Sequence, residues 1–200
     1  MEKQEKLREE LNENFSSAII DGDISSLQTL YSKLKKLNRN IKASETECVD
    51  LSDLAENVCI AADIILRDSG KTVVFCGNDV SPVFSNRQIL TKAVLEAVGS
   101  ACIHGESPLV TVKTQERKRF VTAEIQCMGN FLPQNSESLE FIKNAVKKFD
   151  GEALTVYGKE FSSVVMTFKK ANKINPMPNK NFIELVSDRL SPVFVELYGL

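Results

Sequence analysis

The sequence predicts an α+β protein, in which a helical hairpin is followed by an α/β sandwich. Two observations predict this fold class. Residues 2–43 carry apolar side chains at helical spacing, and from Val49 onward helical stretches alternate with short runs in which apolar and polar residues alternate. The predicted sheet is mixed and mostly antiparallel, with its helices on one face. We expect three parts, with the bounds 1–46, 47–170 and 171–200.

The first part predicts two helices, over residues 2–20 and 24–43, with a break at 21–23. Asp23 is the expected N-cap of the second helix. The apolar stripes consist of Leu7, Leu11, Phe15, Ala18 and Ile19 in the first helix and of Leu27, Leu30, Leu34, Leu37 and Ile41 in the second. A hairpin this short cannot bury both stripes by itself, so we expect a homodimer through residues 2–43.

The second part predicts an alternation of helices and strands. The helices are expected from an N-cap at Ser52 to a C-cap at Gly70, over 87–105, and over 139–151. The strands are expected over 71–76, 109–114, 119–127, 153–158 and 161–170, with a short extended segment at 81–86. This order of elements is typical of an α/β sandwich.

The third part predicts a linker followed by a docked tail. Residues 171–181 contain two Pro and four Asn, which is typical of a linker. A short helix with one apolar face is predicted from Phe182 to Ser191-Pro192, and residues 193–197 then alternate as in a strand. We expect the tail to cover an edge or a face of the preceding domain that the short connection at 133–138 leaves open, and to add a strand if it meets an edge.

Composition excludes several partners and locations. The net charge of −2 favours neither nucleic acid nor an acidic membrane as a partner. No apolar run reaches the roughly 18 residues of a membrane span, and the charged N-terminus does not resemble a signal peptide. The five cysteines form no C-x-x-C pair, which favours small core residues of a reduced, cytoplasmic protein over a metal site or disulfides. A zinc site would also need histidine, and His104 is the only one.

Three stretches carry a family resemblance through their order and spacing. They are "VDLSDLAENV" at 49–58, "SACIHG" at 100–105 and "AVKKFDGEALTVYGKEFSSVVMTF" at 145–168. With the hairpin in front, the chain resembles a sensor histidine kinase core, whose ATPase domain belongs to the GHKL superfamily. Its layout is similar to that of the sporulation phosphotransferases. The resemblance implies a histidine-kinase-like ATPase fold, ATP and Mg²⁺ as possible ligands, a dimer, and a response-regulator-like partner in two-component or phosphorelay signalling.

The residues at the family's nucleotide site depart from its pattern. Glu96 and Ser100 stand where the resemblance implies the two Asn of Asn-x-x-x-Asn, which bind Mg²⁺ and phosphate. Cys127, Gly129 and Phe131 stand at the three key positions of Asp-x-Gly-x-Gly, whose Asp accepts a hydrogen bond from adenine. A thiol is a poor substitute for that acceptor, and Phe131 replaces a glycine that allows the backbone to approach the ligand closely.

The family's lid and phosphoacceptor have no counterpart in the sequence. Only "PQNSES" at 133–138, which contains no glycine, lies between Leu132 and the next predicted helix. The resemblance implies a phosphoacceptor histidine near "LNENFSSAII" at 11–20, and this stretch contains none. His104 matches a histidine that is structural in the family.

Two functions are compatible with these residues. The first is a dimeric docking scaffold that has lost ATP binding and phosphotransfer and has no catalytic residue, metal or cofactor. The second is a divergent ATP-binding kinase or ATPase that uses Glu96 and Gly129 under a minimal lid. They differ in whether the pocket under residues 127–135 is open or is filled by side chains such as Met128 and Phe131.

Overall fold

The structure is a computed structural model, and it describes residues 13–39, 45–77, 80–134, 136–172, 176 and 178–197. The chain divides into two compact units, the first ending at Ile41 and the second beginning at Lys42. In the first unit, residues 13–20 are helical and are followed by α2 (Ile24–Arg39). These are the two predicted helices of the hairpin, as far as the described residues reach.

Local interactions close the turn between the two helices. Gly22 adopts a left-handed conformation with φ of +65°. The Asp23 carboxylate accepts a hydrogen bond from the Ser26 backbone N–H at 3.1 Å, which confirms Asp23 as the N-cap of α2. Hydrogen bonds from the Ser26 hydroxyl and backbone lower the pKa of Asp23, because they stabilise its charged form.

Several side chains of the predicted stripes are buried in the single chain. The rings of Phe15 and Tyr31 pack with their centroids 4.6 Å apart. The other buried apolar side chains of the described hairpin are Ala18, Leu27 and Leu34. Ile20 and Ile24 remain exposed near the turn, while Leu7, Leu11, Leu37 and Ile41 fall outside the described side chains. The homodimer through residues 2–43 therefore stays a prediction.

The second unit contains the sheet. Its elements in chain order are β1 (Glu47–Asp50), α3 (Leu51–Leu66), the 3₁₀ helix η1 (Arg67–Ser69), β2 (Thr72–Cys76), β3 (Pro82–Ser85), α4 (Arg87–His104), β4 (Leu109–Glu116), β5 (Phe120–Met128), α5 (Glu137–Lys147), β6 (Glu152–Tyr157), β7 (Phe161–Lys169), α6 (Phe182–Ser187) and α7 (Pro192–Leu197). The main sheet has the order β2-β4-β5-β7-β6, in which β2 and β4 are parallel and every other neighbouring pair is antiparallel. Strands β1 and β3 form a separate antiparallel pair.

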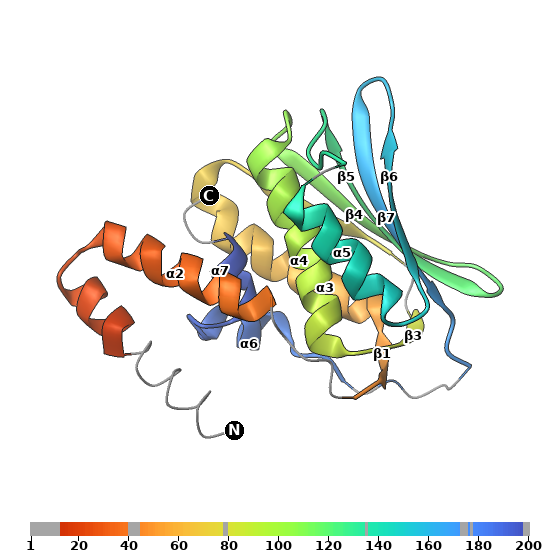
Figure 1. Cartoon of the computed structure of the whole chain (residues 1–200), viewed down its shortest axis with the longest axis horizontal. Coiled ribbons are helices and arrows are strands. Elements are labelled where there is room, and N and C mark those ends of the chain that lie inside the picture. The colour runs from red at the N-terminus through yellow and green to blue at the C-terminus, as the bar shows by residue number, and fades with distance from the viewer. Residues whose placement is uncertain are drawn as a thin grey trace. The chain divides into compact units, whose positions relative to one another are not determined.

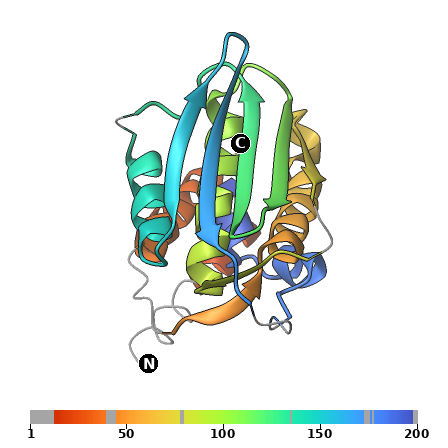
Figure 2. The ribbon, with the colours of Figure 1, turned by 90° about the vertical axis from the view of Figure 1, so that its right-hand side faces the viewer.

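Helices α3, α4 and α5 cover one face of the main sheet, and Figure 2 shows the other face without a helix. Strand β5 explains this arrangement, because Val121, Ala123, Ile125 and Cys127 are buried and alternate with more exposed residues. The α+β class and the mixed, mostly antiparallel sheet with helices on one face are therefore confirmed.

The start of α3 differs from the sequence prediction. Asp50, not Ser52, is the N-cap, and its carboxylate accepts hydrogen bonds from the backbone N–H groups of Ser52 and Asp53. The Ser52 hydroxyl is used elsewhere, in a buried cluster with the hydroxyls of Ser81 at 3.0 Å and Thr114 at 2.6 Å. Both contacts join residues far apart in the chain, so the local pattern could not reveal them.

The tail docks on the second unit, as predicted, but in a different conformation. We call residues 178–197 the strap. Helices α6 and α7 of the strap lie on the side of α3 and α4 that faces away from the sheet (Figure 1). The strand predicted at 193–197 is wrong, because this segment is α7. Pro192 occupies the first turn of α7, where a missing N–H costs nothing, and the Ser191 hydroxyl accepts a hydrogen bond from the Phe194 N–H at 3.3 Å.

Helix α4 is covered on both sides, by the sheet and by the strap. Every residue from Thr91 to Ser100 is buried. A methyl group added to Gly99 would lie 3.6 Å from Leu197 Cδ2, so α7 packs directly on this helix. Burial all round requires cover on both faces, and the strap supplies the face opposite the sheet.

Candidate functional site

The candidate site lies where β5 ends beside the last turns of α4. Cys127 is the last inward-facing residue of β5 and is buried. Its sulfur lies 3.9 Å from the carbonyl oxygens of Ala101 and Ser107. A methyl group added to Gly105 would lie 2.3 Å from that sulfur. The thiol therefore fills the space at the strand end and offers no strong acceptor to a ligand.

Gly129 forms the turn after β5. Its φ is +77°, and a methyl group at this position would lie 2.7 Å from Glu106 Cγ. The Gly129 N–H donates to the Glu160 carbonyl at 3.0 Å, and the Ser162 hydroxyl donates to the Gly129 carbonyl. Both backbone groups of Gly129 are thus bonded to the β6–β7 hairpin, which holds the turn in place.

Phe131 is a core residue. Its exposed fraction is 0%, and the following Leu132 is also buried. The Tyr157 hydroxyl donates to the Leu132 carbonyl at 3.0 Å, which ties this segment to β6. Met128, the other side chain considered as a filler of the pocket, points away from the interior and is 40% exposed. Of Met128 and Phe131, only Phe131 lies in the interior.

Glu96 and Ser100 lie one turn apart on α4, and both are buried. The Ser138 hydroxyl donates a hydrogen bond of 2.5 Å to Glu96 Oε1. Ser138 belongs to the first turn of α5, so this bond joins the two helices. The Glu96 carboxylate is therefore already engaged by a neighbour within the protein.

Lys92 adds a buried positive charge one turn before Glu96. Burial lowers the pKa of Lys92 from 10.5 to about 8, and the carboxylates of Glu196 and Glu96 act in the opposite direction. Glu196 belongs to α7 of the strap and is also buried. One face of α4 thus brings together a lysine and two glutamates, one of which comes from the end of the chain.

The N-terminus of α5 carries its own negative groups. Helix N-termini attract anions because their first N–H groups are free and the helix dipole is positive there. In α5 the Ser136 hydroxyl accepts the hydrogen bond of the Leu139 N–H at 3.2 Å, and Glu137 and Glu140 lie in the first turn. The glutamates disfavour a phosphate group at this end of the helix.

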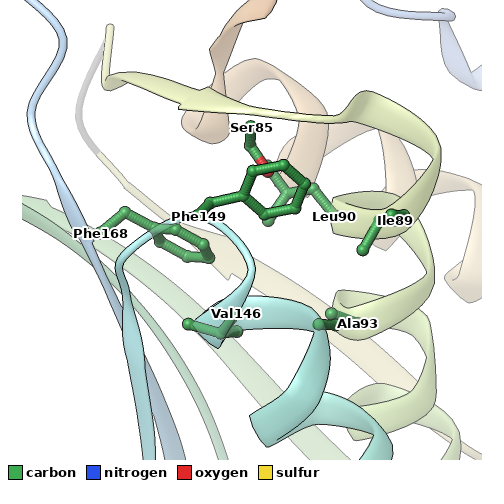
Figure 3. Close-up of a pocket in the computed structure, with 8 residues that line it drawn as sticks. Ser85, Ile89, Leu90, Ala93, Val146, Phe149 and Phe168 are labelled. Carbon is green, nitrogen blue, oxygen red and sulfur yellow. The ribbon is translucent and has the colours of Figure 1, made fainter. Parts of the chain in front are cut away.

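Figure 3 shows a small pocket elsewhere between α4 and α5. It leaves no room for a water molecule and is lined by Ser85, Ile89, Leu90, Ala93, Ala145, Val146, Phe149 and Phe168. The lining is apolar apart from Ser85, whose hydroxyl has no hydrogen-bond partner among the described residues. None of the five predicted site residues lines this pocket.

Among the described residues, the histidine and the cysteines are not gathered into a site. His104 is exposed at the end of α4. The cysteines are free thiols, and Cys59, Cys102 and Cys127 are buried. Within the described part of the chain, no group of histidine, cysteine or acidic side chains is arranged to hold a metal ion, and no helix is long and apolar enough to cross a membrane.

Comparison with solved structures identifies the fold. The ATP-binding domain of PrrB from Mycobacterium tuberculosis matches with a TM-score of 0.56 and 18% identity, covering 64% of this chain and all 100% of that one. The histidine kinase AdeS of Acinetobacter baumannii matches with a TM-score of 0.58 and 14% identity, covering 84% of this chain and 98% of that one. The second unit has the histidine-kinase ATPase fold. No protein-family model and no curated protein matches the sequence, and at this low identity the likeness establishes the fold alone.

A third match has a nucleotide in its structure. Full-length ShkA in complex with AMPPNP gives a TM-score of 0.57 and 13% identity, covering 76% of this chain and 36% of that one. In this histidine-kinase ATPase fold, the five predicted site residues come from α4, from the end of β5 and from the segment after it. Cys127 lies beside the turn of α4 that follows Ser100.

Sequence reasoning missed three residues of this region, namely Lys92, Ser138 and Glu196. One signal was available for the first. Lys92 and Glu96 are opposite charges at positions i and i+4 within the otherwise apolar run "ILTKAVLEAVGSACI". Charges inside such a run indicate a polar contact at a buried helix face. Nothing local indicated that a residue of the tail would join them.

Proposed function

We propose that this protein is a histidine-kinase-like member of a two-component or phosphorelay system that acts as a dimeric docking scaffold. In this proposal it neither binds ATP nor transfers phosphate. The fold supports the kinase-like class of the protein. The residues at the site support the loss of ATP binding and phosphotransfer.

The complete burial of Phe131 is the observation that carries the proposal. In the family pattern this position is a glycine, which leaves room for the ligand beside the turn. Here a phenyl ring with no exposed surface occupies it, and the Cys127 thiol is packed against Gly105. ATP would have to displace core side chains before it could make its own contacts.

The affinity expected from these changes is low. An unmade hydrogen bond to a buried partner costs about 1–3 kcal/mol. Cys127 removes the adenine acceptor, Ser100 is a shorter metal ligand than asparagine, and residues 129–136 are too short to form a lid. Together these losses amount to about 5 kcal/mol, and each 1.4 kcal/mol is about tenfold in affinity. A micromolar site would become millimolar or weaker.

Phosphotransfer lacks its acceptor. The hairpin of a histidine kinase carries a histidine that forms a phosphoramidate, and residues 1–46 contain no histidine. His104, the only one in the chain, belongs to the end of α4 in the second unit. Without phosphotransfer, the activity left to the dimeric hairpin is to dock a response-regulator-like protein.

Calorimetric titration of the full chain with ATP and Mg²⁺ tests the loss of nucleotide binding. We expect no dissociation constant tighter than about 1 mM. The Cys127→Asp variant should bind no better, because Phe131 still fills the site. A low micromolar constant for the unmodified chain would contradict the proposal and favour a divergent ATP-binding kinase or ATPase that uses Glu96.

Light scattering tests the dimer separately. We expect the mass of a dimer for the full chain. Replacing the exposed Ile20 and Ile24 by aspartate should shift it to a monomer if the turn end of the hairpin contributes to the interface. A monomeric full-length chain at micromolar concentration would rule out the dimeric scaffold.

A further inference from the structure

The strap begins with specific hydrogen bonds to α3. The Asn179 side-chain amide donates to the Asp50 carbonyl at 2.9 Å and to the Asp53 carboxylate at 2.7 Å. The Phe182 backbone N–H donates to the Asn57 side-chain oxygen at 2.9 Å. The Asn57 amide in turn donates to the Asp53 carbonyl at 2.8 Å, which orients the acceptor. These bonds position the strap along the first two turns of α3.

The strap ends in an apolar contact with α4. Val193, Val195 and Leu197 of α7 are buried. Gly99 presents no side chain to α7, and Leu197 lies above it at ordinary packing distance. A methyl group would fit at this position, so α7 packs on α4 at ordinary van der Waals distance.

The same end of the strap also buries a charge. The exposed fractions are 7% for Glu196, 5% for Lys92 and 4% for Glu96. Burying a charge that lacks an opposite charge is strongly unfavourable, and removing one partner of a buried pair destabilises the structure more than removing both. A methyl group added to Gly99 would lie 3.9 Å from the Glu196 carbonyl oxygen, and Gly99 lies two turns after Lys92 on the same face of α4. The carboxylate of Glu196 favours the charged form of Lys92. Apolar packing alone does not explain a buried acidic residue in α7, because a buried carboxylate costs free energy unless it is paired.

We propose that Glu196 locks the strap onto α4 through Lys92, so that residues 178–197 form a releasable cover over the helix face that carries Lys92 and Glu96. The hydrogen bonds to α3 hold the start of the cover in register, and the charge contact holds its end. Release of the end uncovers Lys92 and the apolar surface around Gly99 while the sheet stays folded. The proposal does not depend on whether ATP binds.

Hydrogen exchange on the full chain tests the lock. The Glu196→Gln variant keeps the shape of the side chain and removes its charge. We expect the amides of α7 to exchange at least tenfold faster in this variant, because loss of the charge favours the opened strap. The ratio of exchange rates measures the change in that opening equilibrium. The matched control is Glu184→Gln, which removes an exposed carboxylate from α6 of the same strap. It should change exchange in α7 by less than twofold.

A second pair of variants tests whether Lys92 is the partner. Lys92→Met leaves the buried carboxylates of Glu96 and Glu196 without the cation of Lys92, so it should also accelerate exchange in α7. In the combined Lys92→Met and Glu196→Gln variant, the acceleration should be at least fivefold smaller than the product of the two single effects. Independent effects that simply multiply would show that Glu196 acts on something else.

Three results would overturn the proposal. Equal exchange in the Glu196→Gln and Glu184→Gln variants would mean that the charge of Glu196 does not hold the strap. Multiplying effects in the combined variant would exclude Lys92 as the partner. Loss of protection throughout β5 and β7 in the Glu196→Gln variant would mean that the strap is an inseparable part of the core rather than a releasable cover.

Discussion

Truncation of Phe131 tests whether a position that is glycine in the family pattern has become part of the core. The Phe131 side chain has no exposed surface, so Phe131→Ala removes a ring from a packed site and leaves a cavity. Such truncations cost about 3–5 kcal/mol of unfolding free energy. Since 1 kcal/mol shifts Tm by roughly 2–4 °C for a domain of this size, Tm should fall by about 6–20 °C.

Thermal and urea unfolding followed by circular dichroism measure this change on the full chain. Phe161→Ala is the matched control, because it removes the same ring from a side chain that is 46% exposed. We expect the control to cost less than about 1.5 kcal/mol, as only part of its apolar area is buried. The Phe131→Ala variant should also fail to bind ATP, because the smaller side chain restores neither the adenine acceptor nor the lid.

A small effect would refute the reasoning. If Phe131→Ala costs under about 1 kcal/mol, or no more than the Phe161→Ala control, the ring does not support the core. The turn after β5 would then be adaptable enough to admit a ligand, and the central observation behind the scaffold would be lost.

Three further predictions concern stability. Gly129→Ala should cost about 1–3 kcal/mol in urea unfolding, because φ is +77° and the new methyl group meets Glu106 Cγ. Adding Glu106→Ala to this variant should recover only the part of the loss that comes from the clash, and not the part that comes from the backbone conformation. Asp50→Ala should cost about 2 kcal/mol in the same assay because it removes an acceptor from three backbone N–H groups, including that of Ser81, whereas Asp50→Asn should cost less than half as much. Burial raises the pKa of Cys102 from 9.0 to about 11, so the unfolded chain loses this proton at lower pH than the folded chain, and the free energy of unfolding should fall as pH rises from 9 to 11. In thermal melts over this range, the free energy of unfolding of Cys102→Ala should fall by about 3 kcal/mol less than that of the unmodified chain.

The position of the helices and strands followed from short-range patterns. Period-2 alternation in residues 119–127 predicted β5, and an apolar helical pattern in 87–105 predicted α4, each to within a few residues. Asp23 was identified as a cap because capping depends on a hydrogen bond between residues close in sequence. Such features are dictated by neighbours along the chain, so one sequence suffices to find them.

The tail shows where local reasoning fails. Alternation at residues 193–197 fits a strand, yet this segment is α7. A six-residue segment has little conformational preference of its own, and packing on α4 decides its state. The same holds for the N-cap of α3, because Ser52 has an equally suitable hydroxyl that is drawn instead to Ser81 and Thr114.

The sequence by itself determined the fold class, the order of elements and the departure from the family pattern at Cys127 and Phe131, because periodicity and residue chemistry are local properties. Only the tertiary structure decided that Phe131 is buried, that Ser138 engages Glu96, and that Glu196 is buried in α7, where its carboxylate acts on Lys92. These contacts depend on which surfaces meet after folding. Burial changes the free energy of a charge or a ring far more than its sequence neighbours do.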